Sequence, residues 1–242
     1  MNLAIDVGNT LVKLAVFNNG KLQQKKTCIK KDFLTTLSTL SETFKNIDSA
    51  IVSTVSNFTD HQFLKLQQRF QVHTLDYQTK IPFTNKYTTP KTLGVDRIAL
   101  ISAAAIQFPK KNVLVIDVGT CITYDYLTHD NEYLGGAISP GIGLRYKALN
   151  NYTEKLPLLD PNTPTNMVGN STASSIHSGV IFGIVNEIDG FIDAYKTICS
   201  NLTVILTGGD AHFLRENLKN NIFANSNFLL EGLNHILEYN KR

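Results

Sequence analysis

The sequence has few cysteines, and their spacing disfavours both a disulfide framework and a zinc site. Its 242 residues contain three cysteines, Cys28, Cys121 and Cys199, at wide spacing and without a C-x-x-C pair. Disulfide frameworks and zinc sites use even sets or closely spaced cysteines. The six histidines, His177 among them, form no H-x-x-x-H or H-x-E pattern. We therefore expect reduced thiols and histidines with structural or surface roles.

The sequence also lacks a long hydrophobic run. No stretch approaches the roughly 20 continuous apolar residues that a membrane helix needs. Asp6 stands where a signal peptide would have its apolar region. We expect a cytoplasmic protein that has no membrane partner.

Charge of one sign is not in excess either. The formal net charge is only +3, and the basic residues are scattered instead of forming a run. Proteins that bind nucleic acid usually gather positive charge on one face or stripe, so we expect no nucleic-acid partner. The length allows one large domain or two modest ones, each with a buried core.

An internal repeat divides the chain. The letters NLAIDVGNTLVKLAV at residues 2–16 have a counterpart in NVLVIDVGTCITYDY at residues 112–126. Each copy begins a β-meander, and strand and helix patterns alternate after it. We predict an α/β protein with two duplicated halves, residues 1–112 and 113–242.

The expected elements follow from apolar periodicity and from turn residues. In the first half, strands are predicted over residues 3–6, 11–17, 21–29, 50–55 and 72–75, and helices over 33–45, 60–70 and 95–107. In the second half, residues 112–126 repeat the plan of the first strands, further strands are predicted over 133–138 and 203–207, and the helices are 143–150, 172–195 and 231–239. Asn18-Asn19-Gly20 marks a hairpin, Asp32 an N-cap, and Phe63, Leu64 and Leu66 an inward helix face.

The turn after the first strand, Asp6 to Thr10, has the composition of a phosphate-binding loop. Glycine lets a phosphate approach the backbone amides, and the carboxylate can hold a hydrated cation that bridges phosphate oxygens. The alternative is an ordinary hairpin turn, which is equally compatible with one copy. The second copy at Asp117-Val-Gly-Thr120 favours a pair of turns that hold ATP between the two halves.

Two further features remain ambiguous from spacing alone. The strand ending in Thr207-Gly-Gly-Asp210 can approach a nucleoside closely, and Asp210 can equally be the N-cap of a following helix. Asp96 can be a helix N-cap or a local partner of Arg97, or it can act in catalysis. The polar loop between Pro82 and Pro90 is long enough to be functional.

These motifs resemble the superfamily of sugar kinases, Hsp70 chaperones and actin, and more specifically the type III pantothenate kinases. The similarity covers nearly the whole chain in order. It rests on the segments DVGNTLVK at 6–13, YTTPKTLGVDR at 87–97, DVGTCIT at 117–123, GGAISPG at 135–141, 172–179 and LTGG at 206–209.

The resemblance implies a fold of two duplicated ribonuclease H-like domains, as in actin-like ATPases, each with a mixed β-sheet flanked by helices. It implies ATP-dependent phosphorylation of pantothenate to 4′-phosphopantothenate, the first step of coenzyme A biosynthesis. The first half would carry the phosphate loop, the substrate loop and the general base, and the second half a further phosphate loop, a cation site and the adenosine motif. Implied cofactors are Mg²⁺ with ATP and a monovalent cation, K⁺ or NH₄⁺. A homodimer is also implied.

The same resemblance assigns roles residue by residue. Asp96 would be the general base. The implied ATP contacts are Asp6, Val7, Gly8, Asn9, Thr10, Leu11, Val12, Lys13 and Thr120. The implied pantothenate contacts are Tyr87, Gly94, Val95, Asp96, Arg97 and Thr172, and Asp117 would bind the monovalent cation. Lys13 would supply positive charge, and Arg97 would either pair with the pantothenate carboxylate or position Asp96. His177 stands where most members have glutamine and is expected to pack, and Cys121 is expected to be a small buried residue.

Two other functions stay open. Proteins resembling this family include accessory factors of a bacterial transcriptional regulator, which would bind rather than turn over a substrate. The absence of a basic patch and the joint presence of Asp6, Asp96 and Asp117 disfavour that reading. An acid-sugar or acetate-type kinase is the other alternative, and the segment Tyr87–Arg97 disfavours it.

Overall fold

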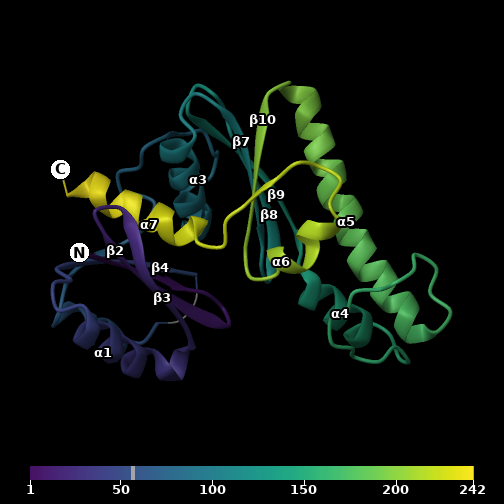
Figure 1. Cartoon of the computed structure of the whole chain (residues 1–242), viewed down its shortest axis with the longest axis horizontal. Helices are drawn as coiled ribbons and strands as arrows, with labels where there is room; N and C mark the ends of the chain where they lie inside the picture. Colours follow the sequence, from purple (N-terminus) through teal and green to yellow (C-terminus); the bar gives the residue numbers. More distant parts are fainter. Residues whose placement is uncertain (56–57, 242) are drawn as a thin grey trace. The chain divides into compact units, whose positions relative to one another are not determined.

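The protein has two compact units, each with its own sheet. The computed structural model describes residues 1–55 and 58–241. The first unit comprises Met1–Pro109, Asn131–Tyr133 and Asn227–Arg242, and the second comprises Lys110–Asp130 and Leu134–Ser226. Figure 1 follows the chain in colour through both units.

The first unit is built on a mixed five-stranded sheet. Its strand order is β3-β2-β1-β4-β5. The bounds are β1 Asn2–Val7, β2 Leu11–Asn18, β3 Lys21–Ile29, β4 Ser49–Thr54 and β5 Gln71–Thr74. The β1–β2–β3 meander is antiparallel, whereas β4 runs parallel to β1 and to β5. Asn19 and Gly20 have φ of 49° and 76°, the left-handed conformation that tight hairpin turns require.

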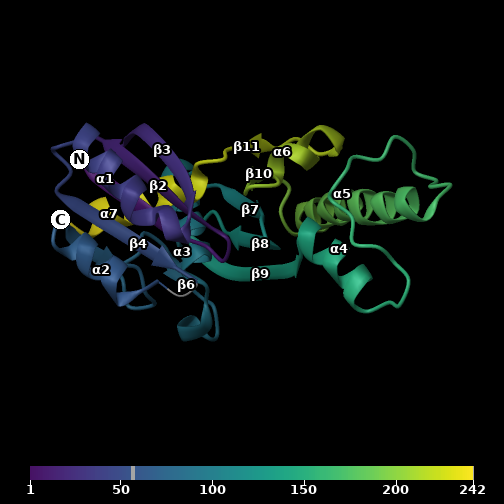
Figure 2. The ribbon, with the colours of Figure 1, turned by 90° about the horizontal axis from the view of Figure 1, so that it is seen from below.

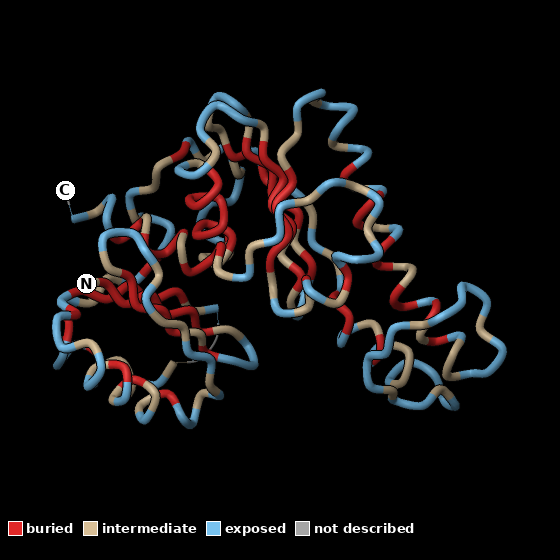
Figure 3. The backbone as a smooth tube through the Cα atoms, viewed as in Figure 1, coloured by how far each residue is buried: buried red, intermediate tan, exposed pale blue. Residues whose placement is uncertain are grey.

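The two faces of this sheet carry different helices. Leu3, Ile5 and Val7 of β1 pack in a hydrophobic core together with helix α1 (Phe33–Thr43). Because side chains alternate along a strand, Asn2, Ala4 and Asp6 point to the opposite face. All six residues of β1 are buried, and Figure 3 draws buried backbone in red.

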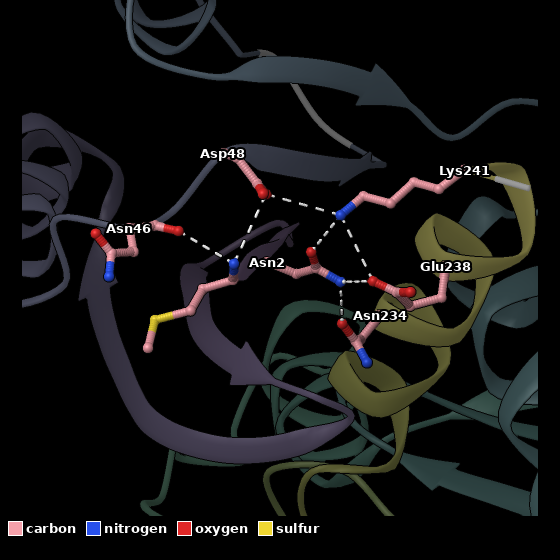
Figure 4. Close-up of polar contacts among 7 residues, drawn as sticks. Asn2, Asn46, Asp48, Asn234, Glu238 and Lys241 are labelled. Atoms are coloured by element: carbon pink, nitrogen blue, oxygen red, sulfur yellow. Dashed lines mark hydrogen bonds and ion pairs between the residues drawn. The ribbon is translucent and has the colours of Figure 1, made fainter.

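The C-terminal helix α7 (Phe228–Asn240) lies on the Asn2 face. Asn2 donates to Asn234 Oδ1 at 2.8 Å and to Glu238 Oε1 at 2.6 Å, as Figure 4 shows. Helix α7 also packs against α3 (Val95–Gln107), so closely that a Cβ at Gly232 would come within 1.9 Å of the Ala99 carbonyl oxygen. The last helix of the chain thus belongs to the first unit.

Shorter elements complete the first unit. Helix α2 (Asp60–Gln67) packs against α1 and β5 (Figure 2). The two-residue strand β6 (Thr84–Asn85) pairs with Glu132 and Tyr133. These pairings anchor the polar loop that precedes α3.

The second unit repeats the local topology of the first. Its strands belong to a six-stranded sheet of order β11-β10-β7-β8-β9-β6, in which β6 is the two-residue strand already described. The bounds are β7 Asn112–Val118, β8 Cys121–Leu127, β9 Glu132–Pro140, β10 Leu202–Thr207 and β11 Phe223–Ala224. Strand β7 is antiparallel to β8 and parallel to β10, just as β1 is antiparallel to β2 and parallel to β4. The helices are α4 (Ile142–Asn151), the 27-residue α5 (Thr172–Ile198) and the short α6 (Ala211–Leu214). Helix α5 packs its isoleucines against Leu114 and Ile116 of β7.

The predicted α/β fold class of two mixed sheets flanked by helices is confirmed, with some corrections. The side chain of Leu64 is exposed, so its predicted inward orientation is wrong. Asp32 and Asp210 stand at the N-cap positions of α1 and α6, but within the described part of the chain neither side chain accepts a capping hydrogen bond. The division of the duplicated sequence at residue 112 stays a prediction. None of the helices within the described ranges is long and apolar enough to cross a bilayer.

Candidate functional site

The first candidate site lies at the end of β1, where Asp6 and Lys13 face each other. They are directly opposite in the β1–β2 ladder, and Lys13 Nζ lies 3.9 Å from Asp6 Oδ2. The turn between them closes with a hydrogen bond of 3.0 Å from the Gly8 amide to the Leu11 carbonyl. Asn9 and Thr10 at the tip are exposed. The turn therefore presents short polar residues above a buried carboxylate.

Asp6 has an unusual protonation behaviour. Burial raises the pKa of Asp6 to about 6; the positive charge of Lys13 opposes this rise, and the negative charge of Asp96 adds to it. The influence of Asp96 means that the two carboxylates interact electrostatically within the first unit. Negative charge in this neighbourhood attracts cations.

Asp96 is held at the first turn of α3. Its Oδ1 accepts a hydrogen bond of 2.8 Å from the backbone amide of Arg97. The N-cap of the helix is Gly94, so Asp96 is not the N-cap. A Cβ at Gly94 would lie 2.4 Å from Asp96 Oδ1, so this glycine leaves room for the carboxylate in its present orientation.

Arg97, in the first turn of α3, and Tyr87, on the loop before the helix, form an aromatic and cationic cluster. The Arg97 guanidinium lies 5.5 Å from the centre of the Tyr87 ring, and the side chain is 5% exposed. Tyr87 stacks on Tyr133 with an interplanar angle of 16°. Stacking holds the planar guanidinium in one orientation. Of the predicted substrate residues in this unit, Gly94 and Arg97 thus adjoin Asp96, and Tyr87 contacts Arg97.

Two residues on the Asp6 face were not found from the sequence. Lys25, on β3, lies opposite Ala15 of β2 and donates to Asn227 Oδ1 at 2.9 Å. Burial, together with the nearby charge of Lys13, lowers the pKa of Lys25. Ser53 is the neighbour of Asp6 on β4 and is fully buried. Its hydroxyl has no hydrogen-bond partner within residues 1–55 and 58–241. Neither residue stands in a recognisable sequence pattern, since the ladders bring them to the site.

The second unit has a corresponding set of turns at the ends of β7, β9 and β10. The Gly141 amide donates to the Thr120 carbonyl, and the Asp210 amide donates to the Val118 carbonyl, both at 3.0 Å. A Cβ at Gly141 would lie 2.1 Å from the Gly119 carbonyl oxygen. The three predicted motifs of this half thus converge through their backbones.

Asp117 sits where two of these turns meet. Thr207 is its neighbour on β10. The next residue, Gly208, has φ of 102° and lies so close to Asp117 that a Cβ on it would be 2.5 Å from Asp117 Oδ1. Burial raises the pKa of Asp210, and His212 opposes the rise. Oxygen-rich turns of this kind suit hard cations.

Thr172, the predicted substrate contact of the second unit, lies elsewhere in it. It is exposed at the start of α5 and lines a cavity of about 970 Å³ together with Arg145, Asn170 and Ile176. His177 accepts or donates a hydrogen bond of 2.7 Å with the Tyr146 hydroxyl, which fits its predicted packing role. Cys121 is exposed, so the expectation of a buried cysteine is wrong: its position at the start of β8 leaves it at the edge of the turn.

The donors available for metal ions are compatible with Mg²⁺ bound together with a nucleotide. Within the described ranges, no group of three or more His, Cys, Asp or Glu side chains could hold a metal by itself. Mg²⁺ commonly takes one or two carboxylates, with phosphate oxygens and water completing its shell. The buried Asp6 carboxylate, influenced by Asp96, fits that requirement.

Two mixed sheets flanked by helices, each with an Asp-x-Gly turn at the end of a central strand, give this protein the fold of the actin-like kinases. A glucokinase from an Antarctic psychrotroph shares the fold, with a TM-score of 0.52, 11% identity and 98% of each chain covered. A family model described as type III pantothenate kinase matches residues 2–194, and the chain belongs to that family.

Two other similar proteins differ in how they are described. The type III pantothenate kinase of Flavobacterium johnsoniae is 49% identical over 239 residues, covering 99% of this chain and 98% of that protein. A crystal structure from Campylobacter jejuni, described as a candidate Baf family transcriptional activator, has a TM-score of 0.64 and 25% identity, with 99% and 98% of the two chains covered.

Proposed function

We propose that this protein phosphorylates pantothenate with ATP to give 4′-phosphopantothenate, the first step of coenzyme A biosynthesis. The observation that carries the proposal is the buried Asp6 carboxylate facing Lys13 at the end of β1, in a chain that belongs to this family. It supports a phosphate site in the same unit as Asp96, the carboxylate proposed to act on the alcohol. Phosphoryl transfer needs such positioning more than covalent participation by the protein.

Asp96 is the general base in this proposal. Its Oδ1 is oriented by the Arg97 amide, so the carboxylate can accept a hydrogen bond from the primary hydroxyl of pantothenate and take its proton late in the step. Arg97 either pairs with the pantothenate carboxylate, for which its planar fork is suited, or positions Asp96. The other proposed pantothenate contacts are Tyr87, Gly94, Val95 and Thr172.

The phosphates of ATP are assigned to the turn from Asp6 to Lys13. Lys13 places positive charge where negative charge develops on the transferred group, and the Gly8 turn offers backbone amides. Mg²⁺ would neutralise phosphate charge when bound, held in part by Asp6. In the second unit, Thr120 contacts ATP and Asp117 binds K⁺ or NH₄⁺. A homodimer in the cytoplasm is part of the proposal, and the three cysteines are free, as a reducing compartment requires.

The similarity to the Campylobacter jejuni protein favours a second candidate, a binding role in transcription. A panel of acceptors separates the possibilities. The purified protein is incubated with ATP, Mg²⁺ and pantothenate, a sugar acid or acetate, with and without K⁺ or NH₄⁺, and products are identified by mass spectrometry. Phosphopantothenate as the dominant product supports the proposal. Phosphorylation of another acceptor, or of none under any cation condition, would overturn it.

A further inference from the structure

Glu187, in the middle of α5, is the centre of a polar network in the second unit. The Tyr124 hydroxyl donates to Glu187 Oε1 at 2.8 Å, and the Ser139 hydroxyl donates to the same oxygen. The other oxygen, Oε2, binds Nη2 of Arg145. Strands β8 and β9 and helices α4 and α5 each contribute one residue to this network.

The network keeps Glu187 charged. Burial disfavours the carboxylate, but hydrogen bonds from Ser139, Arg145 and Tyr124 and the charge of Arg145 hold the pKa of Glu187 below its usual value. About a fifth of each of the Arg145 and Glu187 side chains is exposed, so the pair is largely shielded from solvent. A charged pair with this many hydrogen bonds has few alternative geometries.

Arg145 carries this fixed geometry to the end of β9. Its Nη2 is bound to Glu187, and its Nε donates to the Pro140 carbonyl at 2.9 Å. Both bonds come from one planar guanidinium, so the position of Pro140 depends on that of Glu187. Lysine could satisfy one of these acceptors but not both in this arrangement.

Pro140 is followed by Gly141, which touches the second phosphate turn. The Gly141 amide donates to the Thr120 carbonyl at 3.0 Å. A Cβ at Gly141 would lie 2.1 Å from the Gly119 carbonyl and 2.6 Å from that of Thr120. With backbones this close, a shift of Pro140 and Gly141 must displace Gly119 and Thr120.

We infer that Arg145 and Glu187 are positioning residues that set the Gly119–Thr120 turn for nucleotide binding. The inference rests on the proposed function in one respect, the assignment of Thr120 as an ATP contact. It predicts that damage to the network weakens ATP binding more than pantothenate binding, because the proposed pantothenate contacts other than Thr172, Asp96 and Arg97 among them, belong to the first unit.

Arg145→Lys tests the inference most sharply, because it keeps a positive charge for Glu187 and removes the Nε donor to Pro140. We expect the Kd for ATP, measured by calorimetry without pantothenate, to rise about tenfold, the size of effect of losing a hydrogen bond of this type. The KM for ATP should rise in parallel, and the KM for pantothenate should change less. Glu187→Gln replaces the charged partner of Arg145 by a neutral amide, and it should also raise the Kd for ATP.

Tyr126→Phe is the matched control. Tyr126 lies on the same strand as Tyr124, and its hydroxyl donates to Asn112 Oδ1 at 3.1 Å. The substitution removes this hydroxyl at the end of β8 that is remote from the Gly119–Thr120 turn. Its Kd for ATP should equal that of the wild type. Thermal unfolding of all variants shows whether each is folded at the assay temperature. If Arg145→Lys is not folded, the Kd of Glu187→Gln for ATP tests the inference in its place.

Two results would overturn the inference. One is a wild-type Kd for ATP in the folded variants. The other is an equal weakening for ATP and pantothenate, since this would indicate general loosening of the protein. The calorimetric readout also separates the inference from the proposed function. If the wild type binds ATP but does not phosphorylate pantothenate, the proposed function fails while the positioning role stays testable.

Discussion

Lys13 lies directly opposite Asp6 across the β1–β2 ladder, with 3.9 Å between Nζ and Oδ2. The lysine side chain is 31% exposed and the carboxylate 8%. The partner of the buried charge is thus open to solvent, so the ion pair only partly offsets the burial of Asp6. The charged Asp6 consequently lowers the stability of the folded protein, as expected of a group that acts on a ligand.

Asp6→Asn should stabilise the ligand-free protein at pH 8 and abolish turnover. The folded-state pKa of about 6 lies above the usual value of 3.8, so between these values the folded state binds more protons than the unfolded state. Stability therefore falls as pH rises through this window, and the full cost is present above pH 6. Removing the charge should increase the free energy of unfolding by about 1–3 kcal/mol at pH 8, measured by urea denaturation.

The pH dependence supplies the control for this prediction. The wild type and Asp6→Asn should differ little in stability near pH 4, where Asp6 is largely protonated in the folded state. A variant that is less stable than the wild type at pH 8 would show that the Lys13 pair outweighs burial, contrary to our account.

Gly94→Ala should reduce kcat about 100-fold, with a small effect on the KM for ATP. The backbone at Gly94, with φ of −58° and ψ of 132°, is open to alanine, but the new Cβ would displace Asp96 Oδ1. A misplacement of about 1 Å in a catalytic group has effects of this size. Gly190→Ala is the control: among the described residues a Cβ there meets nothing within 4 Å. If Gly94→Ala kept the kcat of the wild type, the present orientation of Asp96 would not be needed for catalysis.

The neighbouring glycines Gly208 and Gly209 should respond differently to alanine. At Gly208, a Cβ would lie 2.3 Å from the Val118 carbonyl oxygen and 2.5 Å from Asp117 Oδ1, on a backbone with positive φ. Gly208→Ala should therefore cost about 2 kcal/mol or more in stability and raise the KM for ATP. At Gly209 a Cβ meets nothing within 4 Å of the described atoms, so Gly209→Ala should resemble the wild type in stability. Equal effects of the two variants on melting temperature and KM would contradict this prediction.

Arg97→Lys distinguishes the two roles left open for Arg97. If the guanidinium pairs with the pantothenate carboxylate, the KM for pantothenate should rise about tenfold with kcat largely kept, since lysine has no planar fork. If Arg97 instead positions Asp96, kcat should fall and KM should stay. An unchanged KM in steady-state kinetics would rule out the direct contact.

Much of the fold could be predicted because local patterns and packing agree. The bounds of β3 and α3 match the sequence prediction, since a hairpin turn and a proline delimit them. The position of α7 in the first unit could not be predicted, because an apolar helix face does not reveal which sheet it covers. Leu64 was assigned inward on helical periodicity alone, yet it is exposed on α2, whose buried residue is Leu66.

The candidate site was predictable where chemistry is concentrated in short motifs. The turn at Asp6 and the segment ending in Asp96 and Arg97 are contiguous in sequence, and their roles stay predictions. Arg145 and Glu187 were missed because they are 42 residues apart and each is an ordinary charged residue in a helix. Their connection exists only after α4 and α5 have folded onto the sheet.

Transfer of labelled phosphate tests the central claim most directly. ATP labelled in the γ-phosphate is incubated with pantothenate, Mg²⁺ and K⁺, with the wild type and Asp96→Asn side by side, and ATP binding is measured in parallel. Our account predicts label in 4′-phosphopantothenate with the wild type, and bound ATP but almost no labelled product with Asp96→Asn. Equal labelled product from both proteins would contradict the role of Asp96, and absence of labelled phosphopantothenate from the wild type would contradict the proposed function itself.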